Sequence, residues 1–390
     1  MRVLMINVVC GIRSTGRICT DLAVALEEKG HEVKIAYGRG TVPEQFRKYS
    51  IRIGKDFDTK LHAAKARIFD SSGLGSKSAT EDFINWVKEY NPDVIHLHNI
   101  HGYYINIKVL FAYLKTCGKK IIWTLHDCWS FTGHCAYFDY IGCNKWKTGC
   151  EHCLQKSDYP ARIGPDMSKR NYALKKALFT GVRNMILVTP SKWLADLISK
   201  SYLKEYPTKV IHNGIDTNFF KETKNNIKEK YNCQNKKIIL GVAAVWDKRK
   251  GLSDCVELSK LVNESYQIIL IGLSKKQIKE LPNNIIGVEK TDSIQELVEF
   301  YSAADVFINP TLEDNYPTTN LEAIACGTPV ITYDTGGSPE SAMMYGKCVS
   351  KGEIEEMYHY IKNANGIRKE AKPLEIDYRE TVWKYIELYK

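Results

Sequence analysis

The sequence contains no long hydrophobic run. Its apolar stretches stay well short of the ~18 residues that a membrane-spanning helix needs. Glycine and proline are also scarce, with 26 and 12 residues in 390, which excludes a collagen-like repeat and a low-complexity chain. The amino-terminal stretch MRVLMINVVC lacks the small residues of a signal-peptide cleavage site, so it fits a buried first strand better. We therefore expect a cytoplasmic protein whose 12 cysteines are thiols or metal ligands rather than disulfides.

The composition is that of a folded, globular protein. Hydrophobic residues make up 44% of the chain and charged residues 26%, which excludes a disordered chain and a fibre. At roughly 100–200 residues per domain, the length predicts two domains.

The charge is distributed unevenly between the two halves. Residues 1–215 carry 32 Lys and Arg against 19 Asp and Glu, a net charge of +13, whereas residues 216–390 carry 23 against 26, a net charge of −3. The basic excess is densest from Lys108 to Lys209, with 17 basic and 7 acidic residues. Such a half suits an anionic partner, namely phosphate groups, an anionic membrane surface or nucleic acid. A solvated, lysine-rich surface without a partner is the alternative.

Strand-like and helix-like segments alternate along nearly the whole chain, which predicts βαβ units and parallel sheets. The expected strands cover residues 2–9, 32–37, 93–98, 120–126 and 185–189, and then 237–245, 267–272, 305–310 and 329–333. We expect helices at 17–29 and 80–90, an irregular segment at 41–78, and a domain boundary in the polar stretch 216–235.

This pattern predicts an α/β protein with two doubly wound, Rossmann-like domains, residues 1–215 and 216–374. A carboxy-terminal helix at residues 375–390 would pack back on the first domain. Ligands of such sheets bind beyond the carboxyl ends of the strands, which here predicts a cleft between two facing domains.

A cysteine-rich insertion occupies residues 128–153. Cys135, Cys143, Cys150 and Cys153 are spaced C-x7-C-x6-C-x2-C, and the last pair could offer two thiolates to one tetrahedral ion. We therefore predict a structural zinc ion that supports this loop and takes no part in catalysis. Reduced thiols packed among the aromatic residues of the insertion are one alternative, and a disulfide is another.

The most informative segment runs from Asn309 to Pro329, with the sequence NPTLEDNYPTTNLEAIACGTP. A strand ends there, an acidic turn follows, Pro317 opens a helix and Gly327 closes it. The N–H groups of the first helical turn could hold a phosphate, and Glu322 could accept hydrogen bonds from a pair of sugar hydroxyls. Taken alone, the segment would be better explained as a solvated acidic turn before an ordinary helix.

Together with other motifs, this segment resembles the acidic signature of the family 4 glycosyltransferases, retaining enzymes with the two-domain GT-B fold. The matching segments follow one another along the chain as DVIHLH at 93–98, TPS at 189–191, HNGID at 212–216, KG at 250–251, LEAIACGTPV at 321–330 and GGSPE at 336–340. The resemblance extends over nearly the whole chain. The cysteine-bearing loop suggests the branch that makes capsule, exopolysaccharide and colanic acid.

The acidic turn departs from the family pattern. The first of the two family glutamates would fall at Asp314, which follows Glu313, so either carboxylate could serve. The glycine-rich turn that usually comes next is replaced by Asn315, Tyr316 and Pro317. The family arginine would fall at Val245, and we expect Arg249 to replace it.

The resemblance implies a role for each candidate residue. Arg249 and Lys250 would hold the leaving diphosphate, whose negative charge grows in the transition state. Glu322 would hold the nucleotide ribose, and Asp314 or Glu313 would contact the donor sugar, as would His126 at the end of a strand. The remaining candidates are Asn315, Tyr316 and Thr318 on the donor side, and Gly11, Ser14, Thr15, Gly16 and His98 in an acceptor or phosphate loop. No metal or other cofactor is implied for the transfer step.

We therefore expect a retaining glycosyltransferase that moves a hexose-type sugar from a UDP- or GDP-sugar to a lipid-linked or oligosaccharide acceptor in surface polysaccharide biosynthesis. It would work at the inner face of the plasma membrane and bind no nucleic acid. A sugar-nucleotide epimerase or phosphorylase of the same fold is one alternative. A non-catalytic, basic nucleic-acid-binding protein is another, but it would show aromatic residues interleaved with the basic ones.

Overall fold

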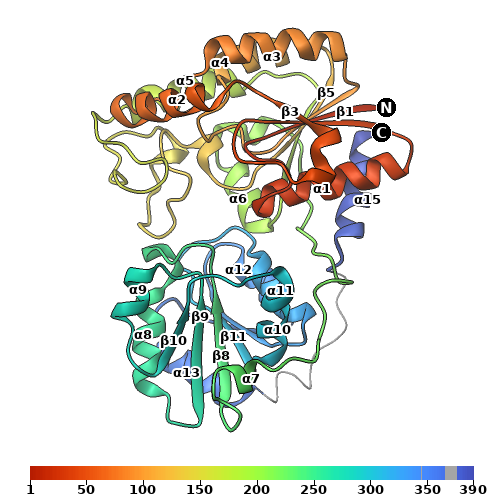
Figure 1. The fold of residues 1–390 in the computed structure, drawn as a ribbon. Helices are drawn as coiled ribbons and strands as arrows, with labels where there is room; N and C mark the ends of the chain where they lie inside the picture. Colours follow the sequence, from red (N-terminus) through yellow and green to blue (C-terminus); the bar gives the residue numbers. More distant parts are fainter. Residues whose placement is uncertain (344, 365–375) are drawn as a thin grey trace. The chain divides into compact units, whose positions relative to one another are not determined.

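The computed structural model describes residues 1–343, 345–364 and 376–390. The chain forms two compact units (Figure 1). The first unit contains Met1–His212 together with Thr381–Lys390, and the second contains Asn213–Glu380. Residues 374 and 375, where the sequence places the end of the second domain, lie outside the described part of the chain.

The first unit is built on a seven-stranded parallel sheet with the order β3-β2-β1-β4-β5-β6-β7. Its strands are β1 (Arg2–Asn7), β2 (Glu32–Tyr37), β3 (Ser50–Arg52), β4 (Val94–Leu97), β5 (Lys120–Thr124), β6 (Met185–Thr189) and β7 (Thr208–Val210). Its α-helices are α1 (Arg13–Glu28), α2 (Asp56–Phe69), α3 (Lys77–Tyr90), α4 (Ile107–Leu114), α5 (Ser168–Phe179) and α6 (Lys192–Ser199), joined by most of α15 (Tyr378–Tyr389). Short 3-10 helices lie at η1 (Glu44–Tyr49), η2 (Trp129–Phe131), η3 (Lys145–Lys147) and η4 (Tyr202–Glu205).

Helices cover both faces of this sheet. Figure 1 shows α2, α3, α4 and α5 gathered on one side and α1 and α15 on the other. Alternate residues of the central strands face opposite layers, as the pleat requires. Ile95 of β4 belongs to the same apolar core as Val87 of α3 and Phe111 of α4, whereas the next residue, His96, contacts Tyr385 and Tyr389 of α15. The sheet is therefore buried on both faces, which explains its continuous apolar strands.

Two sequence-based expectations about the first unit are wrong. The helix expected from residue 17 begins at Arg13, so Ser14, Thr15 and Gly16 lie in its first turn rather than in a loop. The segment 41–78, expected to be irregular, contains α2. That helix was missed because the residues it buries are His62 and Ala66, while its large apolar side chains face solvent. In α2 the apolar face therefore points toward solvent, whereas in most helices of globular proteins it faces the core.

The second unit has a six-stranded parallel sheet with the order β10-β9-β8-β11-β12-β13. The strands are β8 (Lys237–Val242), β9 (Tyr266–Ile271), β10 (Ile285–Val288), β11 (Val306–Asn309), β12 (Val330–Tyr333) and β13 (Gly346–Val349). The helices are α7 (Ile227–Lys230), α8 (Leu252–Leu261), α9 (Lys275–Glu280), α10 (Ile294–Ala303), α11 (Thr318–Ala325), α12 (Ser338–Ala342) and α13 (Ile354–Lys362), with the 3-10 turn η5 (Lys248–Lys250). In Figure 1, α8, α9 and α13 lie on one side of the sheet and α10, α11 and α12 on the other.

Each sheet has a position where the order of its strands reverses. It lies between β1 and β4 in the first unit and between β8 and β11 in the second. Loops that leave the carboxyl ends of such neighbouring strands diverge to opposite faces, which opens a crevice suited to ligands. The predicted site residues follow these strands in both units. Among the described residues, no helix combines the length and the apolar character needed to cross a bilayer.

Candidate active site

In the second unit, three loops meet at the carboxyl ends of β8, β11 and β12. Two glycines allow them to approach closely. Gly251 has a φ of +73°, and a Cβ there would lie 2.1 Å from the carbonyl oxygen of Pro310. Gly336 has a φ of +58°, and a Cβ would lie 1.9 Å from the carbonyl oxygen of Asp314. Any other residue would push these loops apart, so both glycines shape the site.

The two predicted cations lie against the acidic turn. The Nζ atom of Lys250 is 2.5 Å from Oδ2 of Asp314, and Nη1 of Arg249 donates to the carbonyl oxygen of Glu313 at 3.2 Å. The backbone N–H of Leu312 donates to the carbonyl oxygen of Arg249 at 2.7 Å, which ties the two loops together. The structure thus brings the charged side chains of Arg249, Lys250 and Asp314 together with the backbone of Glu313 at the carboxyl ends of the strands.

Glu322 lies in the second turn of α11 and is only 5% exposed. The hydroxyl of Tyr301 donates to its Oε2 atom at 2.9 Å, so a partner from α10 fixes the carboxylate. Helix α11 begins at Thr318, and Pro317 before it offers no side-chain hydrogen bond to the first turn. Within the first turn, the N–H of Asn320 donates to the carbonyl oxygen of Pro317 at 3.3 Å, so the start of α11 is closed by backbone and not by a side-chain cap.

The other donor-side candidates belong to the same turn. The backbone N–H of Asn315 donates to Oδ1 of Asp314 at 2.9 Å. Tyr316 is buried, and this burial raises the pKa of its phenol above the ordinary value. These two residues shape the turn that carries Asp314.

A buried polar network lies behind the turn, and its residues were not predicted from the sequence. The side chain of Asn309 at the end of β11 donates to that of Asn320 on α11 at 2.8 Å, and Asn320 donates to Ser341 of α12 at 2.9 Å. The hydroxyls of Thr332 and Ser338 lie 2.7 Å apart. Fully paired buried polar groups specify one arrangement, so this network fixes α11 and α12 at the strand ends. The sequence feature that could have indicated this network is the presence of polar residues within otherwise apolar segments.

In the first unit, the loop after β1 closes on the start of α1. The N–H of Gly11 donates to the carbonyl oxygen of Gly16 at 3.1 Å, so these two predicted residues lie together. The side chain of Asn7, which the sequence analysis missed, donates to the carbonyl oxygen of Val9 at 2.8 Å and to Oγ1 of Thr15 at 3.3 Å. Asn7 thus stabilises the loop that joins β1 to α1. Helix α1 has no acidic residue in its first turn and no side-chain cap, which favours an anion there.

Histidines occupy the carboxyl ends of β4 and β5. Nδ1 of His98 lies 3.1 Å from Nε2 of His126, so the structure brings these two candidates together. Burial lowers the pKa of His126 to about 4 and holds that of His98 well below its ordinary value. Both imidazoles are therefore neutral near pH 7.

A second chain of polar groups, formed by His101, Asp127 and Tyr159, lies beside this pair. Nε2 of His101 lies 2.8 Å from Oδ2 of Asp127, and its Nδ1 lies 2.9 Å from the hydroxyl of Tyr159. Burial raises the pKa of Asp127, but His101, the backbone N–H of Trp129 and His126 together outweigh this effect and hold that pKa below its usual range. Because Asp127 follows His126 directly, this chain also anchors the loop that carries His126.

The four predicted zinc ligands surround one small cavity. Cys135, Cys143, Cys150 and Cys153 line it together with His134. The Cys135 thiol donates a hydrogen bond to Cys153, which lowers the pKa of Cys153 to about 6. Within residues 1–343, 345–364 and 376–390, however, no group of three or more His, Cys, Asp or Glu side chains is arranged to hold a metal ion. The cysteines are all thiols, and zinc remains a prediction.

A buried lysine beside the cysteines could not have been foreseen. Nζ of Lys175 donates to the carbonyl oxygens of Trp129 at 2.7 Å and Thr132 at 3.1 Å, and lies 3.5 Å from the centre of the Trp129 ring. Burial lowers its pKa to about 7. The lysine therefore supports the insertion through backbone oxygens rather than through an acidic partner.

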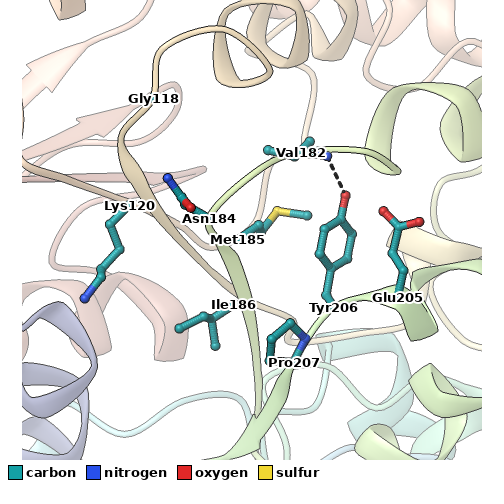
Figure 2. A pocket seen from close by; sticks show the side chains of 9 residues that line it. All are labelled: Gly118, Lys120, Val182, Asn184, Met185, Ile186, Glu205, Tyr206 and Pro207. Atoms are coloured by element: carbon teal, nitrogen blue, oxygen red, sulfur yellow. Dashed lines mark hydrogen bonds between the residues drawn. The ribbon is translucent and has the colours of Figure 1, made fainter.

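A separate pocket lies at the opposite, amino-terminal ends of β5 and β6 (Figure 2). Lys120, Asn184, Met185 and Tyr206 are among its lining residues. The Tyr206 hydroxyl accepts from the N–H of Val182 at 2.9 Å and donates to the carbonyl oxygen of Phe179 at 2.7 Å. These hydrogen bonds fix the Tyr206 side chain within the fold.

Comparison with solved structures defines the class of the fold. The chain aligns over its full length with 98% of sucrose-phosphate synthase from Thermosynechococcus elongatus, with a TM-score of 0.70 and 17% identity. It aligns over 99% of its length with 99% of Anabaena Alr3699/HepE, crystallised in complex with UDP, with a TM-score of 0.66 and 15% identity. Two doubly wound parallel sheets with this likeness are the GT-B fold of glycosyltransferases.

Sequence comparison then gives the family. The model for Glycosyltransferase Family 4 matches residues 15–219, and the model for glycosyl transferases group 1 matches residues 236–364. The chain belongs to Glycosyltransferase Family 4 and is a glycosyltransferase. A protein of Escherichia coli (strain K12) whose name describes a colanic acid biosynthesis glycosyl transferase, WcaC, is 26% identical over 383 residues, which cover 93% of this chain and 90% of WcaC.

Proposed function

We propose that this glycosyltransferase is a retaining enzyme that transfers a hexose-type sugar from a UDP- or GDP-sugar to a lipid-linked oligosaccharide in surface polysaccharide biosynthesis. The observation that carries the donor side is the charge cluster at the carboxyl ends of β8 and β11. There Lys250 and Arg249 contact the acidic turn, directly before the uncapped start of α11.

The cluster suits a nucleoside diphosphate for electrostatic reasons. The leaving diphosphate gains negative charge as the bond to the sugar breaks, and fixed cations stabilise that charge without reorganisation. Lys250 and Arg249 supply the cations. Asp314, which holds Lys250 at 2.5 Å, keeps the ammonium group in place before the donor arrives. Glu322, fixed by Tyr301, would accept the ribose hydroxyls.

Nucleotide binding by the same fold supports the donor class. HepE of Anabaena has been crystallised with UDP and with UDP-glucose. The shared fold makes a UDP-sugar the first donor to test, with a GDP-sugar second. His126, neutral at physiological pH, would form a hydrogen bond to the donor sugar without adding a charge.

The acceptor class rests on the relatives and on the charge. WcaC is named for colanic acid biosynthesis, and an O-antigen chain mannosyltransferase, RfbU of Salmonella typhimurium, is 26% identical over 244 residues. That match covers 60% of this chain and 61% of RfbU. A lipid-linked oligosaccharide presents its diphosphate at a membrane surface. The net charge of +13 on residues 1–215 favours the binding of the anionic diphosphate and of an anionic membrane surface.

A ligand panel tests the donor. The melting temperature should rise with UDP or GDP and rise further with one UDP-sugar or GDP-sugar. ADP and ADP-sugars should leave the melting temperature unchanged. The anomeric configuration of the transferred sugar, measured by NMR coupling constants, tests retention. Inverted product would overturn the retaining mechanism, and no shift with any nucleotide would overturn the donor site.

A further inference from the structure

Helix α2 presents an apolar stripe to solvent. Phe57, Leu61 and Ile68 are 72%, 43% and 45% exposed, and Ala64 between them is also exposed. The spacing i, i+4, i+7, i+11 places all four on one helical face. The residues that α2 buries, His62 and Ala66, lie on the opposite face. The outward face of α2 is therefore its apolar one.

Basic residues border this stripe. With 3.6 residues per turn, Lys60 and Arg67 fall along one edge of the stripe and Lys65 along the other, and all three are exposed. None of the three forms an ion pair within the described ranges of the chain. The acidic residues of the helix are already engaged. Asp56 pairs with Arg52, and Asp58 accepts from the N–H of Lys55 at 2.7 Å.

The apolar surface continues past the end of the helix. Phe69 is exposed, and so is Ile163, whose backbone N–H donates to the carbonyl oxygen of Arg67 at 2.9 Å. That hydrogen bond brings the Ile163 loop to the end of the stripe. A contiguous exposed apolar patch of this kind marks an interaction surface. We call Phe57, Leu61, Ile68, Phe69 and Ile163, with Lys60, Lys65 and Arg67, the α2 patch.

We propose that the α2 patch docks on the surface of an anionic lipid bilayer, with the helix lying in the interface plane. A helix with an outward apolar face flanked by Lys and Arg is suited to insert that face between lipid headgroups while the cations contact anionic lipids. A second copy of the chain fits less well, because a symmetric contact would place the same three cations against each other. The inference builds on the proposed lipid-linked acceptor, because it names the surface by which the enzyme would reach it.

Liposome flotation without substrate tests the proposal. The vesicles contain either phosphatidylcholine alone or phosphatidylcholine with 30% phosphatidylglycerol, which makes about one lipid in three anionic. The wild type should float with the anionic vesicles at low salt and be largely lost at high salt. Phe57→Ser/Leu61→Ser/Ile68→Ser should reduce the partition coefficient at least tenfold. Lys60→Gln/Lys65→Gln/Arg67→Gln should reduce it on anionic vesicles by about fivefold per charge.

Matched variants in the second unit serve as controls. Ile294→Ser/Leu261→Ser removes exposed apolar side chains, and Lys275→Gln/Lys276→Gln/Lys279→Gln removes three exposed lysines from α9. Both should float like the wild type. Equal recovery of the wild type on neutral and anionic vesicles, or unchanged flotation of both α2 variants, would overturn the proposal.

Two further measurements separate the other outcomes. Light scattering that shows a dimer in the wild type and a monomer in the apolar triple variant would assign the α2 patch to a second copy instead. Nucleotide thermal shift should be the same in all these variants. If flotation fails while the nucleotide shift persists, the docking surface is wrong and the proposed donor function stands. If no nucleotide binds while flotation persists, the proposed function fails alone.

Discussion

Nδ1 of His98 lies 3.1 Å from Nε2 of His126, so one of these neutral rings must donate a proton to the other. Nε2 of His98 is buried and has no hydrogen-bond partner within the described part of the chain. A buried N–H without an acceptor costs more than an unused lone pair. We infer that His98 carries its proton on Nδ1 and donates it. His126 then accepts through Nε2 and carries its own proton on Nδ1.

His98 should therefore act as a positioning residue for His126. His98→Phe removes the donor and should lower kcat about tenfold with little change in KM for the donor sugar. His98→Asn keeps an N–H near the same position and should restore most of the activity. The double variant His98→Phe/His126→Ala should be no slower than His126→Ala alone. Additive losses in the double variant would show that His98 acts independently of His126.

Lys250→Ala and Arg249→Ala should each lower turnover much more than stability, because both cations lie at a loop and contact the acidic turn. Loss of a hydrogen bond to a charged group usually costs about 1.5–3 kcal/mol, or roughly 10–100-fold. The urea midpoint checks stability, and a nucleotide-release assay checks turnover. Lys248→Ala in the same turn is the matched control. A double Arg249/Lys250 variant with normal transfer rates would disprove the diphosphate role.

Glu322→Ala should weaken nucleotide binding by roughly 10–100-fold, measured by titration calorimetry. Tyr301→Phe separates this effect from a change in the fold. It removes the hydroxyl that orients Glu322 at 2.9 Å but keeps the carboxylate, so binding should fall by a smaller factor. Unchanged affinity in Glu322→Ala would show that the ribose lies elsewhere.

The free energy of unfolding should fall in mild acid. Burial lowers the pKa of both His62 and His126 to about 4, below the ordinary 6.5. Between these pH values the unfolded chain binds more protons than the folded one. The stabilising contribution is therefore complete above pH 6.5 and is lost as the pH falls toward 4, by about 1.4 kcal/mol per pH unit for each group. Urea midpoints at pH 7.5, 6.5, 5.5 and 5.0 measure this loss, and His62→Gln should flatten the slope. A midpoint that stays constant from pH 6.5 to 5.0 would contradict the burial of these rings.

The cysteine cavity gives a prediction about metal content. If Cys135, Cys143, Cys150 and Cys153 rearrange around zinc, protein purified without chelator should contain about one zinc per chain, matching a four-thiolate site. Cys150→Ser should then reduce both the zinc content and the melting temperature, whereas Cys255→Ser, in α8 of the second unit and not among the residues that line the cavity, should leave the zinc content unchanged. Little zinc together with four thiols that react with Ellman's reagent would favour the packed-thiol alternative.

The sequence indicated the features that repeat along the chain and missed those that depend on contacts. Apolar strands and the motif around Glu322 could be read directly, because they depend on local periodicity and spacing. Helix α2 could not, because its apolar face is turned away from the core. The contact between Lys250 and Asp314 joins residues 64 positions apart, and the His98–His126 pair joins residues 28 apart. Only the parallel order of neighbouring strands places them together.

The return of residues 381–390 to the first unit has a consequence for how the protein is made. The hydroxyl of Tyr389 lies 2.6 Å from Nδ1 of the fully buried His96, and that of Tyr385 lies 3.0 Å from Oγ1 of Thr124, so the middle of the first sheet is covered by residues that follow the second unit in the chain. During synthesis, the second unit emerges from the ribosome while the first still exposes the face that α15 will cover. Completion of the first unit must therefore wait for translation of the second, and a chaperone that shields this face would act during that interval.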